Sequence, residues 1–257
     1  ERADVYGIEF SGETIDYAWE LVDGAASFER LTVHPDGGIR DLPPAQMRAS
    51  VHRVLNEIAP DVVAVHGWAA PDAIAALAWC MATDTPAVVM SESTAHDFER
   101  PGWKEAIKRR AVGQFEAGLV GGIPHKAYLE QLGMPPHRIF VGYDVVDNAY
   151  FRDGAQAAQQ HDDQTRERLG LPDRYFLASN RFIPKKNLSR LIEAFARYRE
   201  EANTEAWDLV LLGDGPRRAS VEAAVEAQKV EPFVHLPGFK QYDELPAYYG
   251  LAGAFVH

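Results

Sequence analysis

The segment Leu177–Leu191, which reads LASNRFIPKKNLSRL, constrains the fold of this chain more than any other stretch. The apolar run Tyr175–Ala178 is typical of a buried strand, and Asn187 begins an amphipathic helix. Arg181 and Lys186 lie in the connection between them. Loops from the carboxyl end of a strand to a helix bind ligands in open α/β sheets. Two cations beside the positive end of a helix favour a diphosphate, although cations at a helix start are often only solvated surface.

Two more apolar runs end in tight turns downstream of this loop. Leu209–Leu212 is followed by Gly213-Asp214-Gly215-Pro216, and Phe233–Leu236 leads into Pro237-Gly238-Phe239. Glycines in such turns let the backbone approach a ligand closely, whereas Asp214 is also suited to cap the helix that follows Pro216. Three strand ends in series predict a parallel half-sheet that binds a nucleotide.

The first half of the chain alternates apolar runs and helical patterns in the same way, which predicts a second, mostly parallel sheet. We expect a Rossmann-like domain over residues 1–150, a polar linker over 151–173 and a nucleotide-binding domain over 174–257. The strands expected in the first domain are Val5–Phe10, Tyr17–Leu21, Val62–Val65, Ala87–Met90, Leu119–Gly122 and Ile139–Tyr143. The helices expected there are Pro44–Ile58, Pro71–Met81, Pro101–Val112 and His125–Leu132. Two such domains side by side would enclose a cleft.

Polar side chains follow two of these strands. His66 ends the run DVVAVH, and its alternative role is a structural hydrogen bond in a half-buried position. Ser91, Glu92, Ser93 and His96 follow the next strand, where they would bind acceptor hydroxyls or only shape the turn before the helix at Pro101. Both sets are candidates because strand-end loops share one edge of a parallel sheet.

Charge and cysteine content exclude several classes of protein. The net charge is −12, with 22 acids and 12 bases in residues 1–150, which argues against a general nucleic-acid binder. Cys80 is the one cysteine, so no intrachain disulfide forms and a reducing, cytoplasmic setting fits.

The basic segment Trp103–Arg110 is most simply a solvated helix face. Its alternative is contact with an acidic acceptor, a lipid-linked phosphate or an anionic membrane surface on the cytoplasmic side.

Motifs of other enzyme classes do not occur in the sequence. There is no Asp-x-Asp motif for a metal-bound diphosphate, and Asp162-Asp163 lies in the polar joint. A Gly-x-Ser-x-Gly elbow and a phosphate loop ending in Gly-Lys-Ser/Thr do not occur either. We therefore expect no metal and no cofactor, so that fixed cations and helix ends would neutralise the charge of a bound diphosphate.

Four segments, SNRFIPKKN, LVLLGDGPRR, VHLPGF and AFVH, resemble in order and spacing the donor domain of retaining glycosyltransferases of the GT-B fold. This is the large family-4-like group that includes sucrose synthases and bacterial mannosyltransferases. The resemblance implies two Rossmann-like domains and metal-independent transfer from a UDP-, GDP- or ADP-linked sugar to a hydroxyl of a saccharide, a lipid-linked or a small-molecule acceptor, with retention of configuration.

The same resemblance implies roles for particular residues. Arg181 and Lys186 would hold the donor diphosphate, and the backbone around Gly238 and Phe239 would contact the base. The segment DVVAVHGWAAPDAIAAL is similar to the family segment whose histidine lies under the transferred sugar, which makes His66 the expected catalytic residue.

Relative to the family, both ends of the sequence suggest a fragment. The chain begins at what resembles the second strand, and the Pro-Ser turn and paired glutamates that follow AFVH in the family do not occur, so we expect an incomplete second domain. Two alternatives stay open. One is a nucleotide-sugar epimerase of the same architecture, with Glu92 or Asp97 as acid and base. The other is a nucleotide-binding module without catalytic parts.

Overall fold

The computed structural model describes residues 3–11, 28–34, 42–97, 101–202 and 205–257 of the chain. The chain divides into two compact units, Glu1–Val146 and Asp147–His257. Each unit is built on a parallel sheet with helical connections, which confirms the expected α/β class with Rossmann-like domains. The expected strand at Tyr17–Leu21 lies outside the described residues.

The sheet of the first unit has four parallel strands in the order β3-β4-β5-β6. The strands are β3 (Val63–His66), β4 (Ala87–Ser91), β5 (Ala117–Val120) and β6 (Ile139–Val141). The helices are α1 (Pro44–Ile58), α2 (Pro71–Thr83), α3 (Gly102–Val112) and α4 (Ile123–Gln131). Val65, Val89 and Val120 are almost fully buried in the core of this unit. Because the strands are parallel, their carboxyl ends lie at one edge of the sheet, and the loops after β3, β4 and β6 leave from that edge.

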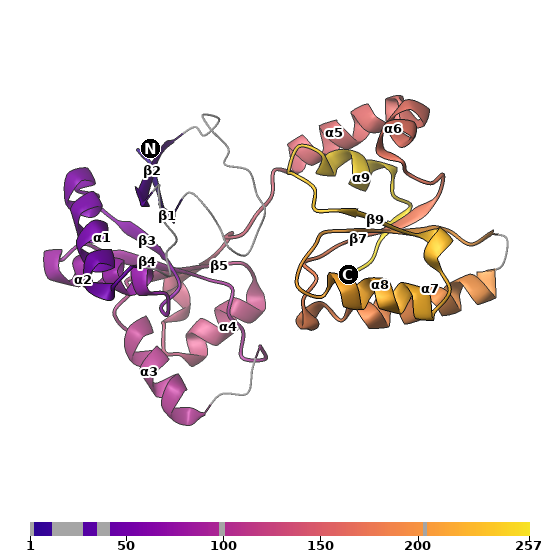
Figure 1. Ribbon diagram of the computed structural model, residues 1–257. Coiled ribbons are helices and arrows are strands. Elements are labelled where there is room, and N and C mark those ends of the chain that lie inside the picture. The colour runs from indigo at the N-terminus through magenta and orange to yellow at the C-terminus, as the bar shows by residue number, and fades with distance from the viewer. Residues whose placement is uncertain (1–2, 12–27, 35–41, 98–100, 203–204) are drawn as a thin grey trace. The chain divides into compact units, whose positions relative to one another are not determined.

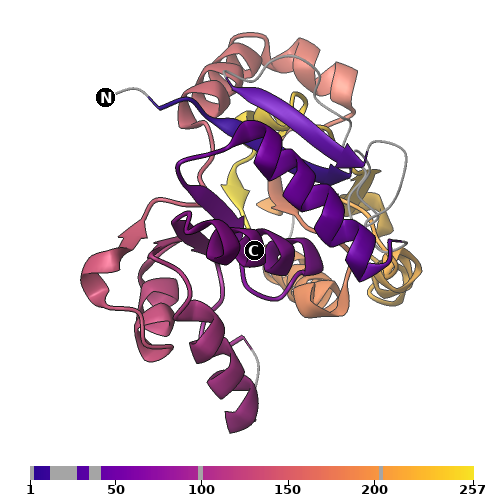
Figure 2. The same ribbon diagram turned by 90° about the vertical axis from the view of Figure 1, so that its left-hand side faces the viewer.

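Two further strands of the first unit form a separate parallel pair, β1 (Tyr6–Ser11) and β2 (Glu29–His34). Helix α1 lies against this pair (Figure 2) and contributes Met47 and Val51 to the same core as Val33. Strand β2 was not expected from the sequence, because ERLTVH carries three charged or histidine side chains and no continuous apolar run.

The sheet of the second unit also has four parallel strands, in the order β10-β7-β8-β9. They are β7 (Tyr175–Ser179), β8 (Asp208–Leu212), β9 (Val234–Gly238) and β10 (Ala254–Phe255). Helices α7 (Leu188–Ala202) and α8 (Arg218–Ala227) cover one face, and α9 (Leu245–Leu251) lies on the other (Figure 1). The strands are added in one direction from β7 to β9, and β10 is then added on the other side of β7. The topological switch point therefore lies between β7 and β10.

The segment expected as a polar linker, 151–173, is helical and belongs to the second unit. It forms most of α5 (Asn148–Gln160) and all of α6 (Asp162–Leu169), which lie on the same side of the sheet as α9 (Figure 1). Asp147 caps α5, because its Oδ1 accepts hydrogen bonds from the amides of Ala149 and Tyr150.

Helix α5 approaches α9 closely through small residues. A Cβ built on Gly154 would lie 2.6 Å from Pro246, and one on Gly250 would lie 2.6 Å from the Cα of Ala155. The Ala/Gln/Asp-rich composition suggested a polar linker. In the structure it belongs to a helix, α5, that packs against α9 through one narrow face of small residues.

Candidate functional site

Backbone hydrogen bonds join the three loops that leave the carboxyl ends of β7, β8 and β9. The bonds run from Asn180 N–H to Leu212 O (3.0 Å), from Phe182 N–H to Asp214 O (2.7 Å) and from Gly213 N–H to Gly238 O (2.9 Å). The sequence-predicted residues of all three loops therefore meet at one edge of the sheet. Because the bonds use main-chain atoms, no side-chain donor or acceptor of the loops is needed to form them.

Two glycines are required where the β7 and β8 loops touch. Gly213 has φ +113°, and a Cβ there would lie 1.9 Å from the carbonyl oxygen of Asn180. Gly215 has φ +149°, and its Cβ would lie 2.8 Å from the carbonyl oxygen of Phe182. Only a residue without a side chain fits between these main chains, which explains the Gly-x-Gly pattern after β8.

The cations expected to bind a diphosphate lie in the β7 loop. Lys186 ends a 3₁₀ turn, Pro184–Lys186, and Asn187 follows in the left-handed conformation with φ +48° before α7 begins. Arg181 and Lys186 are both half-buried. Within the described ranges the side chain of Lys186 makes no hydrogen bond or ion pair, so its ammonium is available beside the positive end of α7.

Asp214 is engaged with its own loop and the following helix. Its Oδ1 accepts the amide hydrogen of Gly215 at 2.7 Å, and its Oδ2 pairs with Arg218 at 3.2 Å. The N-cap residue of α8 (Arg218–Ala227) is Arg217, and no side chain in the described part of the protein caps this helix, so Asp214 shapes its own turn and pairs with Arg218 instead of capping the helix. Phe239, the first residue after β9, is half-buried.

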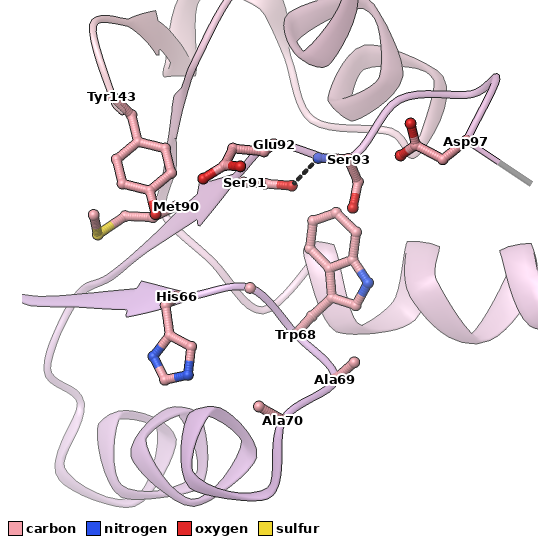
Figure 3. Close-up of a pocket in the computed structure, with 11 residues that line it drawn as sticks. His66, Trp68, Ala69, Ala70, Met90, Ser91, Glu92, Ser93, Asp97 and Tyr143 are labelled. Carbon is pink, nitrogen blue, oxygen red and sulfur yellow. Dashed lines mark hydrogen bonds between the residues drawn. The ribbon is translucent and has the colours of Figure 1, made fainter. Parts of the chain in front are cut away.

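A pocket of about 410 Å³ opens at the strand ends of the first unit (Figure 3). Its lining comes from the loops after β3, β4 and β6: His66, Gly67, Trp68, Ala69, Ala70, Met90, Ser91, Glu92, Ser93, Asp97 and Tyr143. It thus brings His66 together with Ser91, Glu92 and Ser93. His96 is exposed and is not among the lining residues; its amide donates to Thr94 Oγ1 at 3.2 Å.

Part of this polar cluster serves the turn after β4. Ser91 Oγ accepts the amide hydrogen of Ser93 at 3.2 Å, and the carboxylate of Asp97 accepts hydrogen bonds from the amide and the hydroxyl of Thr94. Glu92, by contrast, faces Tyr143. Burial raises the pKa of the Tyr143 phenol, and the charges of Glu92 and Asp144 raise it further.

The two aromatic residues of the lining, Trp68 and Tyr143, were not expected from the sequence. Trp68 packs near Tyr128, with ring centroids 6.5 Å apart. Tyr143 follows β6, the strand at the edge of the sheet. Trp68 follows His66 by only two residues in HGW, so its position in a strand-end loop was the available signal.

His66 is paired with an aspartate that the sequence did not single out. The Nε2 of His66 lies 3.2 Å from Oδ2 of Asp72, the second residue of α2. The hydrogen bond to Asp72 raises the pKa of His66, against an opposing effect of burial. Burial alone would raise the pKa of Asp72. The hydrogen bond and charge of His66 and the nearby backbone amides outweigh this effect, so the pKa of Asp72 lies below its ordinary value.

Helix α3 carries the basic segment Trp103–Arg110. Glu105 and Lys108 face inward, where each bonds to the hydroxyl of Tyr128. Trp103 and Ile107 are 62% and 60% exposed.

No described helix is both long and apolar enough to cross a membrane. In the ranges that the structure covers, no three His, Cys, Asp or Glu side chains gather as metal ligands would.

Solved structures share this architecture. The chain aligns with the Anabaena protein HepE, solved in complex with UDP and glucose, with a TM-score of 0.67 and 14% identity, over 90% of this chain and 61% of HepE. It also aligns with UDP-N-acetylglucosamine 2-epimerase from Rickettsia bellii, with a TM-score of 0.53 and 16% identity, over 88% of this chain and 58% of the epimerase. At these identities the likeness concerns the fold alone.

Sequence comparison finds similarity over part of the chain. The chain is 33% identical over 108 residues to 2-deoxystreptamine glucosyltransferase from Streptomyces kanamyceticus, which is 40% of this chain and 27% of that enzyme. The chain thus spans well under two thirds of the curated relative that it matches. Residues 160–257, which contain the three joined loops, match the family described as "Glycosyl transferases group 1".

Proposed function

We propose that this chain takes part in glycosyl transfer: it binds a nucleoside-diphosphate sugar and supports transfer of a hexosyl group to an acceptor hydroxyl, with retention of configuration and without a metal. The observation that carries the proposal is the joined set of β7, β8 and β9 loops, which falls within the segment similar to group 1 glycosyl transferases. The same region holds Arg181 and Lys186 beside the N-terminus of α7.

The chemistry of the loops suits a diphosphate leaving group. During transfer the bond from the anomeric carbon to the phosphate oxygen breaks, and negative charge grows on the diphosphate. The Lys186 ammonium and the Arg181 guanidinium would neutralise that charge, as would the positive end of α7. The proton of the acceptor hydroxyl would pass to the leaving phosphate oxygen as the new bond forms on the same face. His66 would contact the sugar.

The test is calorimetric titration of the chain with UDP, GDP and ADP in EDTA. We expect one nucleotide to bind without metal. The substitutions Arg181→Ala and Lys186→Ala should each weaken it about 10- to 100-fold, since hydrogen bonds to charged groups contribute about 1.5–3 kcal/mol. Lys185→Ala is the matched control, because Lys185 is the adjacent, exposed cation. Absence of binding, or equal losses in all three variants, would refute the assignment.

Retention needs a separate measurement. NMR of the glycoside product should show the anomeric configuration of the donor sugar, and an inverted product would overturn the front-face course of the reaction. Metal independence is read from the same reaction with and without EDTA.

A nucleotide-sugar epimerase is the second candidate, favoured by the carboxylates of Glu92 and Asp97 in the pocket that also holds His66. An epimerase needs such groups to move protons. Incubating a nucleotide sugar with the chain in the absence of any acceptor distinguishes the two. A new nucleotide sugar in the mixture indicates epimerisation, and an unchanged one is consistent with transfer.

A further inference from the structure

We propose that Asp72 is the positioning residue of His66: its carboxylate holds the Nε2–H of the imidazole and leaves Nδ1 as the ring nitrogen presented to a sugar hydroxyl. The assignment rests on the proposed function insofar as the ligand is a sugar. The orientation of His66 by Asp72 is independent of that function.

The two side chains lie in contrasting environments. The side chain of Asp72 is 10% exposed, whereas that of His66 is 60% exposed and lines the pocket. In Figure 3 the imidazole extends from the end of β3 toward the start of α2, where Asp72 lies two residues beyond Ala70. A buried, anchored acceptor therefore meets an accessible ring at 3.2 Å.

The first turn of α2 satisfies the carboxylate of Asp72 only in part. Ala70, the N-cap residue of α2, provides no side-chain hydrogen bond, and Oδ1 of Asp72 is buried without a hydrogen-bond partner in the described parts of the chain. Burying a half-satisfied carboxylate costs free energy that a neutral residue would not incur. The positive end of α2 offsets part of this cost. The contact between Asp72 and His66 gives this carboxylate a role in orienting the imidazole, which helix capping alone would not explain.

The chemistry of the pair fixes the tautomer. An ionised carboxylate only accepts hydrogen bonds, and a neutral imidazole has one donor nitrogen and one acceptor nitrogen. Nε2 must therefore carry the proton, and Nδ1 has the lone pair that accepts from a hydroxyl. No hydrogen bond to Nδ1 forms within the described residues.

Other titratable groups also lie near His66. The carboxylates of Glu92 and Asp97 and the phenol of Tyr143 line the same pocket, whereas Asp72 and burial are what shift the pKa of His66. On the other side, Ile8 and Val33 line a small apolar cavity of about 70 Å³ together with His66 and Asp72. These neighbours make Glu92→Gln a useful comparison, since it removes a charge from the pocket without touching the 3.2 Å contact.

The experiment is ¹⁵N NMR of the imidazoles in the full chain, with His66 assigned by His66→Gln. In the unsubstituted chain we expect the Nε2–H tautomer of His66 and a raised pKa. In Asp72→Asn the pKa should fall and the two tautomers should mix, because an amide can donate as well as accept. Glu92→Gln should leave the tautomer unchanged. Asp84→Asn, at the exposed C-cap of the same helix, should change neither property. Mixed tautomers in the unsubstituted chain, or an unchanged pKa in Asp72→Asn, would overturn the inference.

Transfer kinetics test the consequence for the sugar. Misplacing a group by about 1 Å can cost about 100-fold in rate, so Asp72→Asn should lower kcat about 10- to 100-fold with a smaller change in donor KM. His66→Gln combined with Asp72→Asn should be no slower than His66→Gln alone. Full additivity of the two losses would show that Asp72 acts elsewhere. If no transfer is detected in any variant while the NMR result holds, the proposed function fails and the positioning of His66 stands.

Discussion

Replacing Gly213 by alanine tests how the joined loops are held. At φ +113° an L side chain is strained, which costs about 1–2 kcal/mol. The new Cβ would lie 1.9 Å from the carbonyl oxygen of Asn180, and ordinary contacts begin at 3.4 Å. The two main chains must therefore separate, which weakens the bonds Asn180–Leu212 and Gly213–Gly238 at about 0.5–1.5 kcal/mol each. The expected destabilisation is about 2–5 kcal/mol.

Urea unfolding followed by circular dichroism measures the loss, and hydrogen exchange of peptides covering 175–183 locates it. Gly133→Ala is the matched control, since Gly133 has φ +102° and nothing within 4 Å of a built Cβ. It should show only the backbone cost of about 1–2 kcal/mol. If the two variants lose the same stability, or if the peptides covering 175–183 exchange as in the unsubstituted chain, the close approach of the loops is wrong.

Two further expectations concern the stability of the second unit. Tyr175 is fully buried and donates to the carbonyl of Tyr248 at 2.7 Å, so Tyr175→Phe should cost about 1–2 kcal/mol in urea unfolding at pH 7. Burial holds the pKa of Tyr175 well above its ordinary value near 10, so the neutral phenol favours the folded state and this stability is lost as the pH rises above about 10. The difference in free energy of unfolding between the unsubstituted chain and Tyr175→Phe should therefore decrease above about pH 10. A difference that stays constant up to about pH 11 would contradict this prediction. Arg199 lies 3.3 Å above the ring of Phe233 and bonds to Asp208 at 3.1 Å, so Arg199→Lys should lose about 1–2 kcal/mol despite keeping the charge. A change of less than about 0.5 kcal/mol, typical of surface substitutions, would argue against this stacking.

Continuous apolar runs made most of the fold predictable. The strands at 87–91, 175–179, 208–212 and 234–238 and the helices at 44–58 and 71–83 lie within two residues of their expected bounds. Strand β5 begins two residues before the expected position, at Ala117, because an apolar run does not show where pairing starts. The linker prediction was wrong for a different reason: α5 fully buries only Ala158 and packs through small residues such as Gly154 and Ala155, which composition alone does not distinguish from a polar linker.

The parts of the site that lie on strand ends could also be expected, since parallel strands bring those ends together. Glu92 and Ser91 were placed in this way near His66. Asp72 could not be, because an aspartate in the first turn of a helix is ordinary capping chemistry in any sequence. Its contact with His66 depends on how the loop 67–70 folds back from β3, a property of tertiary structure that residue types do not encode.

The packing of α5 on α9 determines where the chain can be recombined with its relatives. Helix α5 precedes the second sheet in sequence, yet it fits α9 near the other end of that unit through Gly154 and Gly250. A chimera joined at residue 173 would therefore combine an α5 from one parent with an α9 from the other, and larger residues at either glycine would clash. A junction between Val146 and Asp147 keeps the matched helix pair in one parent.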